Sequence, residues 1–349
     1  MNVTGTVAPT VSVLLPVGGS RTTIRAAVQS VLDQSLDDLE LLLIGQDEPA
    51  ALARLGAGVP DDPRIRVLHR HAPGIVAALN TGLAAARGRF VARMDDDDVA
   101  YPERLERQLD HLLAMPAPGL VGARVRLVDV EGGTDGVGAG SLRYADWLNA
   151  LVAPEAIRQA CFVENPLPHP TWFAERALFE RLGGYADGDF PEDCELVLRA
   201  WRMGVPMSKP EAVLLDWREH PARLTRTDPR YRREAFIRMK ARIAASAEAG
   251  LGLDAGRGAW IVGVGRSARR WCDALLEHGV PVRGFVDLDG PRRRFRKRHR
   301  DVIDYATLRR CLGEDLLIGA VTQPAARRAV DTWCREQGLV PGRDYLLGD

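Results

Sequence analysis

Short apolar runs alternate with amphipathic segments along the first hundred residues of the chain. Four of these runs have the length and composition of buried β-strands: residues 11–17, 39–44, 64–68 and 90–94. Apolar residues recur at helical spacing over 22–34 and over 75–87, where Gly88 follows the second helix. Strands that alternate with helices predict an α/β fold with a doubly wound, mostly parallel sheet.

The same alternation stops and then restarts near residue 258. Before this point the pattern predicts further helices over 102–113, 175–182, 192–203 and 230–249, and the glycine-rich stretch 130–141 predicts a loop. After the glycine-rich stretch 250–258, the pattern predicts a strand, a helix and a strand at 259–264, 267–277 and 282–286. We therefore expect three parts: a larger α/β domain at 9–228, a helix and linker at 229–257, and a smaller α/β domain at 258–349.

Composition excludes several classes of protein. The chain has 349 residues, of which 46% are hydrophobic and 27% charged, so it is long enough to bury a large core. No run approaches the ~18 apolar residues of a membrane span, and residues 1–10 lack the pattern of a secretory signal. Five scattered cysteines argue against a zinc site or a disulfide framework and indicate a cytoplasmic protein.

Net charge is zero, which gives no general case for nucleic-acid binding. It is unevenly spread, because residues 258–349 carry 17 Lys and Arg against 12 Asp and Glu. Seven of these cations lie within residues 291–300. Such a segment either docks on anionic lipid headgroups or is a solvated loop. The first interpretation places the protein at the inner membrane face as a peripheral protein.

Four consecutive carboxylates, Asp95–Asp98, follow the predicted strand 90–94. Ligands of open α/β sheets bind outside the carboxyl ends of the strands. Adjacent carboxylates repel one another, and Mg²⁺ and Mn²⁺ prefer oxygen ligands combined with substrate phosphates. The run therefore indicates either a metal that holds a diphosphate or a solvated acidic turn.

The stretch 82–112, GLAAARGRFVARMDDDDVAYPERLERQLDHL, resembles the donor-binding segment of family 2 glycosyltransferases, which have the GT-A fold. In that family a helix ending in Ala-Arg-Gly precedes a strand, a D-x-D motif, and then a proline and a charged helix. The resemblance covers residues 11–226, about 60% of the chain. It implies an inverting, hexosyltransferase-type enzyme that moves a sugar from a nucleotide-diphosphate sugar to a hydroxyl of a glycan or lipid-linked acceptor. Synthesis of bacterial envelope or extracellular polysaccharide is the implied setting.

The resemblance also assigns roles to two acidic sites. It implies that Asp95 and Asp97 bind Mg²⁺ or Mn²⁺, with His220 as a further metal contact. Residues 165–185 followed by PED look like the family's acceptor-side segment, so Asp193 corresponds to the catalytic base and Glu192 to a supporting residue. Without the resemblance, a Glu-Asp pair is also an ordinary helix start.

Further site residues follow from the same resemblance. Those implied for the donor are Pro16, Val17, Gly18, Asn80, Arg93, Asp95, Asp96, Arg223 and Arg226. His169 and Trp172 are implied for the acceptor. A structural role is the alternative for Asn80, Arg93, His169 and Trp172. The second strand departs from the family, because Gln46 and Asp47 stand where Asp-Asp-Gly-Ser is usual. Either these two residues contact the base, or the donor is not a uridine nucleotide.

The C-terminal domain carries a glycine motif between a predicted strand and helix. Gly263, Gly265 and Ala268 follow the spacing of a dinucleotide fingerprint, and Asp287 ends the next strand. The alternative is a tight turn without a nucleotide. Two competing functions follow: a nucleotide-dependent oxidoreductase or sugar-nucleotide-modifying enzyme centred on this domain, and a catalytically silent scaffold that keeps the GT-A fold.

Overall fold

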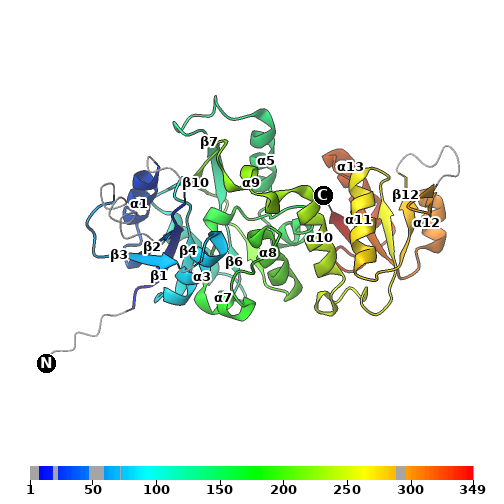
Figure 1. Ribbon diagram of the computed structural model, residues 1–349, viewed down its shortest axis with the longest axis horizontal. Coiled ribbons are helices and arrows are strands. Elements are labelled where there is room, and N and C mark those ends of the chain that lie inside the picture. Colours follow the sequence, from blue (N-terminus) through cyan, green and yellow to red (C-terminus); the bar gives the residue numbers. More distant parts are fainter. Residues whose placement is uncertain (1–7, 19–22, 47–58, 71, 288–295, 349) are drawn as a thin grey trace. The chain divides into compact units, whose positions relative to one another are not determined.

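The computed structural model describes residues 8–18, 23–46, 59–70, 72–287 and 296–348 (Figure 1). The chain divides into two compact units. Unit 1 comprises 1–157, 166–187 and 205–226, and unit 2 comprises 158–165, 188–204 and 227–349. Unit 2 therefore takes in two short segments of the region expected to form the larger domain. The division at 228 and 258 remains a proposal about independent folding.

Unit 1 is built on a sheet whose strand order reverses at its first strand. The order is β3 (Ile65–Arg70), β2 (Leu39–Gln46), β1 (Val11–Pro16), β4 (Phe90–Arg93), β8 (Phe173–Glu175), β6 (Leu120–Val121) and β9 (Met207–Ser208). Strands β3, β2, β1 and β4 are parallel, and β8 runs antiparallel to both β4 and β6. The sheet is thus mixed but rich in parallel pairs, and the expected α/β fold is confirmed.

Helices cover both faces of this sheet, because successive residues of a buried strand point to opposite sides. Val11, Val13 and Leu15 of β1 join the core formed with α1 (Ile24–Leu32) and α4 (Arg104–Leu113). Helix α3 (Ile75–Ala85) packs on β1, β2 and β3, where Gly82 lies close to Leu14 and Ile44. This arrangement is doubly wound, as the alternating pattern predicts.

A smaller sheet completes unit 1, with the order β5 (Val99–Ala100), β10 (Val213–Arg218) and β7 (Arg124–Val128). The remaining helices of the first half are α5 (Ala139–Ala150), α6 (Pro154–Ala160) and α7 (Arg176–Leu182), and α9 (Leu224–Thr227) follows β10. The sequence pattern did not predict α5, since its first residues lie in the glycine-rich stretch expected to be a loop. Gly138 is its N-cap, and only 130–138 is irregular.

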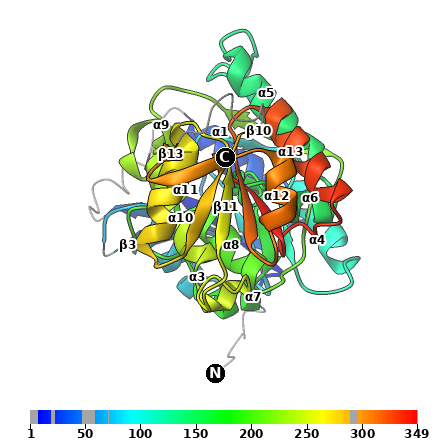
Figure 2. The same ribbon diagram turned by 90° about the vertical axis from the view of Figure 1, so that its right-hand side faces the viewer.

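Unit 2 contains a second sheet, which is parallel except for the antiparallel pair of its first two strands in the order below. Its order is β13 (Arg296–Lys297), β14 (Arg300–Ile303), β12 (Val282–Val286), β11 (Ala259–Val262), β15 (Leu316–Ala320) and β16 (Tyr345–Gly348). Helix α11 (Arg266–Glu277) lies on one face, and α12 (Tyr305–Cys311) and α13 (Pro324–Glu336) lie on the other (Figure 2). Helix α8 (Glu192–Arg202) packs on α10 (Arg233–Ala244), which packs on α11. In the part of the chain that the structure describes, no helix has the length and apolar composition needed to cross a bilayer.

A buried polar network fixes the turn between α3 and β4. Ser12 donates to Glu40 at 2.6 Å, and the backbone N–H of Gly88 donates to Ser12 at 2.8 Å. Burial raises the pKa of Glu40, but hydrogen bonds from Ser12, Arg66 and the Arg87 amide outweigh burial and lower it. The turn passes so close to β1 that a Cβ on Gly88 would lie 2.6 Å from the Ser12 nitrogen.

Replacing Gly88 with alanine is therefore expected to destabilise unit 1 by roughly 1–3 kcal/mol, because the atoms it would meet are backbone atoms that cannot rotate away. Urea unfolding followed by tryptophan fluorescence measures the change. Gly140→Ala is the matched control, since its Cβ would meet only an Arg143 nitrogen at 4.0 Å. Equal stability of the two variants would contradict the close approach.

Candidate functional site

The acidic run lies where the strand order of unit 1 reverses. Strands β1 and β4 are neighbours, yet their connections leave to opposite sides, and the carboxyl ends of such strands are where open α/β sheets bind ligands. Met94 donates its backbone N–H to Leu14 O at 2.9 Å, and Gly18 donates to Asp96 Oδ2 at 2.9 Å. The end of β1 and the acidic run are thus tied together, and Pro16, Val17 and Gly18 lie beside the carboxylates.

Three of the four carboxylates form a cluster. Asp95, Asp97 and Asp98 each offer an oxygen, and these oxygens lie within 4.8 Å of one another. Asp98 is fully buried, and its Oδ1 accepts from the Arg218 backbone N–H at 2.8 Å. Its other oxygen has no hydrogen-bond partner among the described residues. A buried carboxylate oxygen without a donor is the type of ligand that a cation satisfies.

Each carboxylate has a partner from a different part of unit 1. Arg93 pairs with Asp95 at 2.5 Å, and His220 Nε2 lies 2.7 Å from Asp97 Oδ2. Arg218 holds the backbone of the run by donating to Asp97 O at 2.9 Å. His220 therefore lies at the cluster, as its expected metal role requires, although that role remains a prediction.

These partners do not remove the repulsion within the cluster. Burial and the charge of Asp95 raise the pKa of Asp97. Burial and the charges of Asp97 and Asp95 raise the pKa of Asp98 well above its usual range. A divalent cation would reverse both effects, because it stabilises the ionised form of every carboxylate around it. Asp95, Asp97 and Asp98 offer only oxygen ligands, which is the ligand type that Mg²⁺ and Mn²⁺ prefer.

Arg93 lies beneath the cluster with its side chain only 5% exposed. Burial lowers the pKa of Arg93, but the charge of Asp95 outweighs burial and raises it. Its Nε and Nη1 atoms have no partner within the described residues. Arg104 is also buried and donates to the Arg93 carbonyl. Arg93 is thus positioned by Asp95 and retains donors that a phosphate oxygen would accept.

The arginines after β10 point toward a glutamate in this structure. Arg223 lies 3.5 Å from Glu219 and stacks over the Trp217 ring at 4.5 Å. Arg226 pairs with the same Glu219 at 2.7 Å. Their expected phosphate contacts stay predictions; Arg223 lies in the loop that carries His220, and Arg226 lies on α9, which follows that loop.

The Glu192–Asp193 pair opens helix α8 in unit 2, and its two members differ. Glu192 is buried, and its two carboxylate oxygens share the single O–H donor of Tyr231, at 2.9 Å and 2.8 Å. Burial and the charge of Asp193 raise the pKa of Glu192 to about 7. Asp193 is only partly buried, and it accepts from the Asn165 amide at 2.7 Å and from the Cys194 backbone N–H at 2.7 Å.

Three other expected site residues have structural contacts. Both amide atoms of Asn80 bond to the Tyr185 backbone at 2.9 Å. Trp172 is fully buried, and its indole N–H donates to Leu167 O. His169 is buried, its ring lies tilted against that of Trp172, and its Nε2 lies 2.9 Å from the Tyr185 hydroxyl. Burial and the charge of Arg93 hold the pKa of His169 well below its usual range. Their roles in substrate binding remain predictions.

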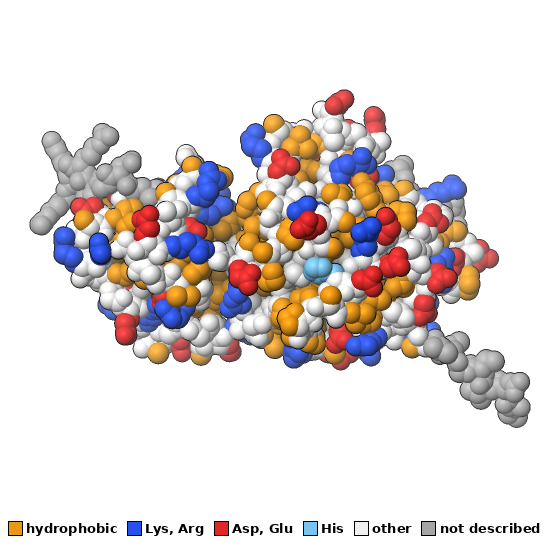
Figure 3. Space-filling model, turned by 180° about the vertical axis from the view of Figure 1, so that it is seen from behind, with side chains coloured by type: hydrophobic (Ala, Val, Ile, Leu, Met, Phe, Trp, Pro, Cys, Tyr) orange, Lys and Arg blue, Asp and Glu red, His pale blue; other side chains and the backbone are white. Residues whose placement is uncertain are grey.

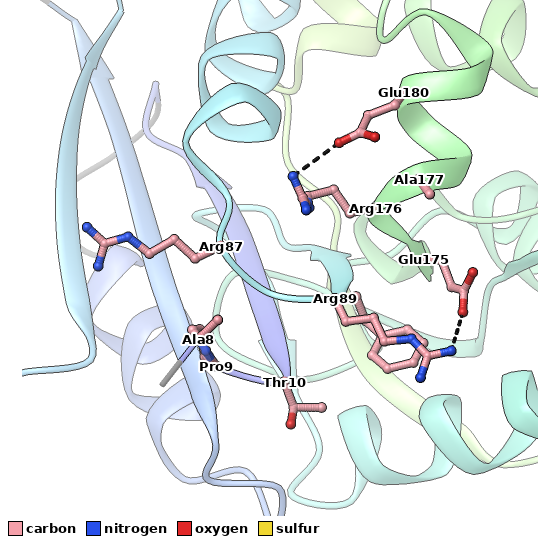
Figure 4. Close-up of a pocket in the computed structure, with 10 residues that line it drawn as sticks. Ala8, Pro9, Thr10, Arg87, Arg89, Glu175, Arg176, Ala177 and Glu180 are labelled. Carbon is pink, nitrogen blue, oxygen red and sulfur yellow. Dashed lines mark hydrogen bonds and ion pairs between the residues drawn. The ribbon is translucent and has the colours of Figure 1, made fainter. Parts of the chain in front are cut away.

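The opposite edge of the sheet carries a separate cavity of about 640 Å³ (Figure 4). Residues that precede β1 and β4 line it, together with the end of β8 and the start of α7. Arg89 pairs with Glu175 at 2.7 Å, and Arg176 pairs with Glu180 at 3.1 Å. These pairs largely neutralise the cavity, and it lies at the amino ends of β1 and β4, away from the acidic cluster.

Sequence reasoning missed several residues that the structure brings to these sites. Arg218, Asn165 and Tyr231 each hold an acidic residue, but lie far from it in sequence. Only Arg218 has a local signal, since it directly precedes the Glu219-His220 pair. Asp47 lies outside the described residues, and the side chain of Gln46 is also not described. Whether Gln46 and Asp47 contact the nucleotide base therefore stays untested, and both alternatives given for these residues remain predictions.

Comparisons with known proteins agree with this geometry. Residues 12–152 match the family model described as glycosyl transferase family 2. An uncharacterised glycosyltransferase, EpsJ from Bacillus subtilis, is 26% identical over 62% of this chain and 63% of its own length. The chain thus spans less than two thirds of this relative.

One further match is named for its substrates, and another is a structure with a bound nucleotide sugar. A glucosyltransferase, WfgD from Escherichia coli, named for transfer from UDP-Glc to GlcNAc-diphosphoundecaprenol, is 36% identical over 30% of this chain and 41% of its own. The structure of S. aureus TarS residues 1–349 with UDP-GlcNAc has a TM-score of 0.50 and 14% identity, covering 78% of this chain and 81% of that one. This likeness concerns the fold alone. Residues 12–152, which contain the acidic run, are the part of the chain that matches glycosyl transferase family 2.

Proposed function

We propose that the protein is an inverting, divalent-metal-dependent glycosyltransferase that moves a sugar from a nucleotide-diphosphate sugar to an acceptor hydroxyl. The observation that carries the proposal is the cluster of Asp95, Asp97 and Asp98 at the switch point between β1 and β4. The family match covers this segment. The mutual repulsion of these carboxylates and the unpartnered oxygen of Asp98 favour binding of Mg²⁺ or Mn²⁺ together with a diphosphate.

In the proposed reaction the acceptor oxygen forms a bond to the anomeric carbon, and the bond from that carbon to the diphosphate oxygen breaks. The metal would supply charge stabilisation to the leaving nucleoside diphosphate. The Nε and Nη1 atoms of Arg93 offer further hydrogen-bond donors to this leaving group. The acceptor proton passes to a carboxylate, and attack from the face opposite the leaving group inverts the configuration.

Asp193 suits the role of that carboxylate better than Glu192. Asp193 is partly exposed, and the Asn165 amide orients it, whereas both oxygens of Glu192 accept from Tyr231. Because its pKa is about 7, Glu192 is partly protonated near neutral pH. Glu192 is therefore proposed to support the helix start and its neighbour rather than to take the proton.

Two variants are expected to affect metal binding and proton transfer separately. Asp97→Asn should weaken Mn²⁺-dependent binding of UDP or GDP at least about tenfold, because it removes one ligand charge. Asp193→Asn should leave that binding unchanged and lower transfer about 10²- to 10⁴-fold. Calorimetry with Mn²⁺ or with chelator measures binding, and nucleoside diphosphate release from a nucleotide-sugar panel measures turnover.

Asp110→Asn is the matched control for lost charge, since Asp110 is exposed on α4. Equal nucleotide affinity with Mn²⁺ and with chelator would refute the metal role. Loss of nucleotide binding in Asp193→Asn would refute the assignment of the base. Intact metal and nucleotide binding without any turnover would favour the silent scaffold.

The raised pKa of Glu192 predicts that the stability of the folded protein depends on pH. Its pKa in the folded protein, about 7, exceeds its ordinary value of 4.5, so the folded state binds the proton more tightly. This contribution is fully present below pH 4.5 and is lost as pH rises through 7. Glu192→Gln cannot titrate, and its melting temperature relative to wild type should therefore be higher at pH 8 than at pH 5.

Tyr231→Phe is the control for this prediction, because it keeps the carboxyl and removes a hydrogen bond that lowers its pKa. Its melting temperature should fall with pH at least as steeply as that of the wild type. Parallel melting curves for wild type and Glu192→Gln across this range would rule out the proposed titration.

We further propose that the acceptor is lipid-linked and that the basic segment 291–300 holds the protein at an anionic membrane. A relative named for a diphosphoundecaprenol acceptor supports the first point. Within the described part of the segment, Arg296 pairs with Asp301 and Arg298 with Asp273, while 291–295 lie outside it. Basic and acidic side chains are interspersed on the face seen in Figure 3, so that face shows no uniform basic patch that would compete with this segment.

Vesicle co-sedimentation tests this membrane contact. Each Lys or Arg near an anionic surface contributes about 1 kcal/mol, so replacing Arg292, Arg293 and Arg294 with glutamine should abolish binding that the wild type shows at low salt. Arg309→Gln with Arg310→Gln is the control, because both side chains are exposed on α12. Binding that ignores lipid charge or salt would exclude the electrostatic mechanism.

A further inference from the structure

The sheet of unit 2 repeats the strand order found around the acidic cluster of unit 1. In chain order its parallel strands are β11, β12, β14, β15 and β16, and in space β11 lies between β12 and β15. The connection from β11 to β12 runs through α11, and that from β14 to β15 runs through α12 on the other face (Figure 2). The switch point of unit 2 therefore lies at the carboxyl ends of β11 and β15.

The glycine motif occupies this switch point. Gly263 ends β11 with φ of 105°, and a Cβ there would lie 3.0 Å from Ala320 O at the end of β15. Gly265 is the N-cap of α11, and a Cβ on it would meet nothing within 4 Å. The loop is thus closely packed at its first glycine and open at its second, where a ligand would approach the helix.

A buried hydroxyl at the same helix end has no partner. Ser267, in the first turn of α11, is 5% exposed, and its Oγ makes no hydrogen bond within the described residues. Side chains of a helix tilt toward its N-terminus, so this hydroxyl lies at the end of α11 that faces the switch point. A buried hydroxyl without a partner costs free energy that a bound acceptor group would recover.

Charge at this helix end favours an anion. The first-turn amides and the helix dipole attract negative charge, and Arg266 is exposed at the first helical position. Asp287 lies at the end of β12, the neighbouring strand, where an acidic side chain accepts from ribose hydroxyls in dinucleotide folds. Ala268 is fully buried, as close packing of α11 on the sheet requires.

We propose that unit 2 carries a second nucleotide site, separate from the acidic cluster, which binds a ribose-diphosphate group at the N-terminus of α11. Gly265 leaves room for the diphosphate, and the hydroxyl of Ser267 and the amides of the first turn bind its oxygens. Asp287 accepts from the ribose. The site needs no metal and is independent of the proposed glycosyl transfer.

Calorimetry of the full chain with ADP-ribose and with UDP, in the presence of chelator, tests this site. Wild type is expected to bind at least one of these probes with a Kd below about 1 mM. Inorganic pyrophosphate should bind at least about tenfold more weakly, because it lacks the ribose that Asp287 would hold.

Gly265→Asp is the decisive variant. Aspartate is a favourable N-cap and finds open space here, so the fold should keep its stability. Its carboxylate would lie where the diphosphate binds and should weaken affinity at least about tenfold. Ser267→Ala should weaken it several-fold.

Gly138→Asp is the matched control. Gly138 is the N-cap of α5, a helix of 12 residues like α11. A Cβ on Gly138 would also meet nothing within 4 Å. This control should bind the probes as the wild type does, and so should Asp97→Asn. No binding of either probe to the wild type, unchanged binding in Gly265→Asp, or equal affinity for pyrophosphate would overturn the proposal. If Asp97→Asn still binds the probes with chelator present, the site in unit 2 exists whether or not the metal-dependent site in unit 1 does.

Discussion

Repulsion among the carboxylates after β4 is the constraint on which the candidate site of unit 1 depends. Asp95, Asp97 and Asp98 place oxygens within 4.8 Å of one another, in a partly buried setting where such charges interact strongly. Arg93, His220 and Arg218 reach the run from β4, from the loop after β10 and from β10 itself. Because these partners come from separate segments, the fold of unit 1 and the electrostatics of the cluster depend on each other.

The same constraint explains why the cluster suits transfer from a diphosphate. Protein groups hold the carboxylates together but leave the pKa values of Asp97 and Asp98 raised and one buried oxygen unsatisfied. In the proposed function a divalent cation would complete the site, held by these carboxylates, and would stabilise the charge of phosphate oxygens. Negative charge concentrated at a switch point is consistent with a position for a metal and an anionic leaving group together.

Much of the fold could be predicted from sequence, because the buried parallel strands are short apolar runs. The strand at Phe90–Arg93 and the acidic run at its end were both visible in this way. Helix α5 was missed because glycines at its start suggested a loop, and β8 was not predicted because a three-residue strand has almost no periodicity.

The partners of the site residues were less accessible. Asn165 and Tyr231 bind Asp193 and Glu192 across 28 and 39 positions of the chain, and no local pattern links them. Likewise, the glycine motif of unit 2 was visible in sequence, whereas the unpartnered hydroxyl of Ser267 and the packing of Gly263 on Ala320 depend on tertiary structure.

Anomalous diffraction at the manganese edge tests the central claim most directly. Crystals of the full chain grown with Mn²⁺ and a nucleoside diphosphate should show an anomalous peak within about 2.0–2.4 Å of carboxylate oxygens of Asp95 and Asp97, and in contact with the diphosphate. A bound diphosphate without a peak among these carboxylates, or a peak elsewhere only, would contradict the account.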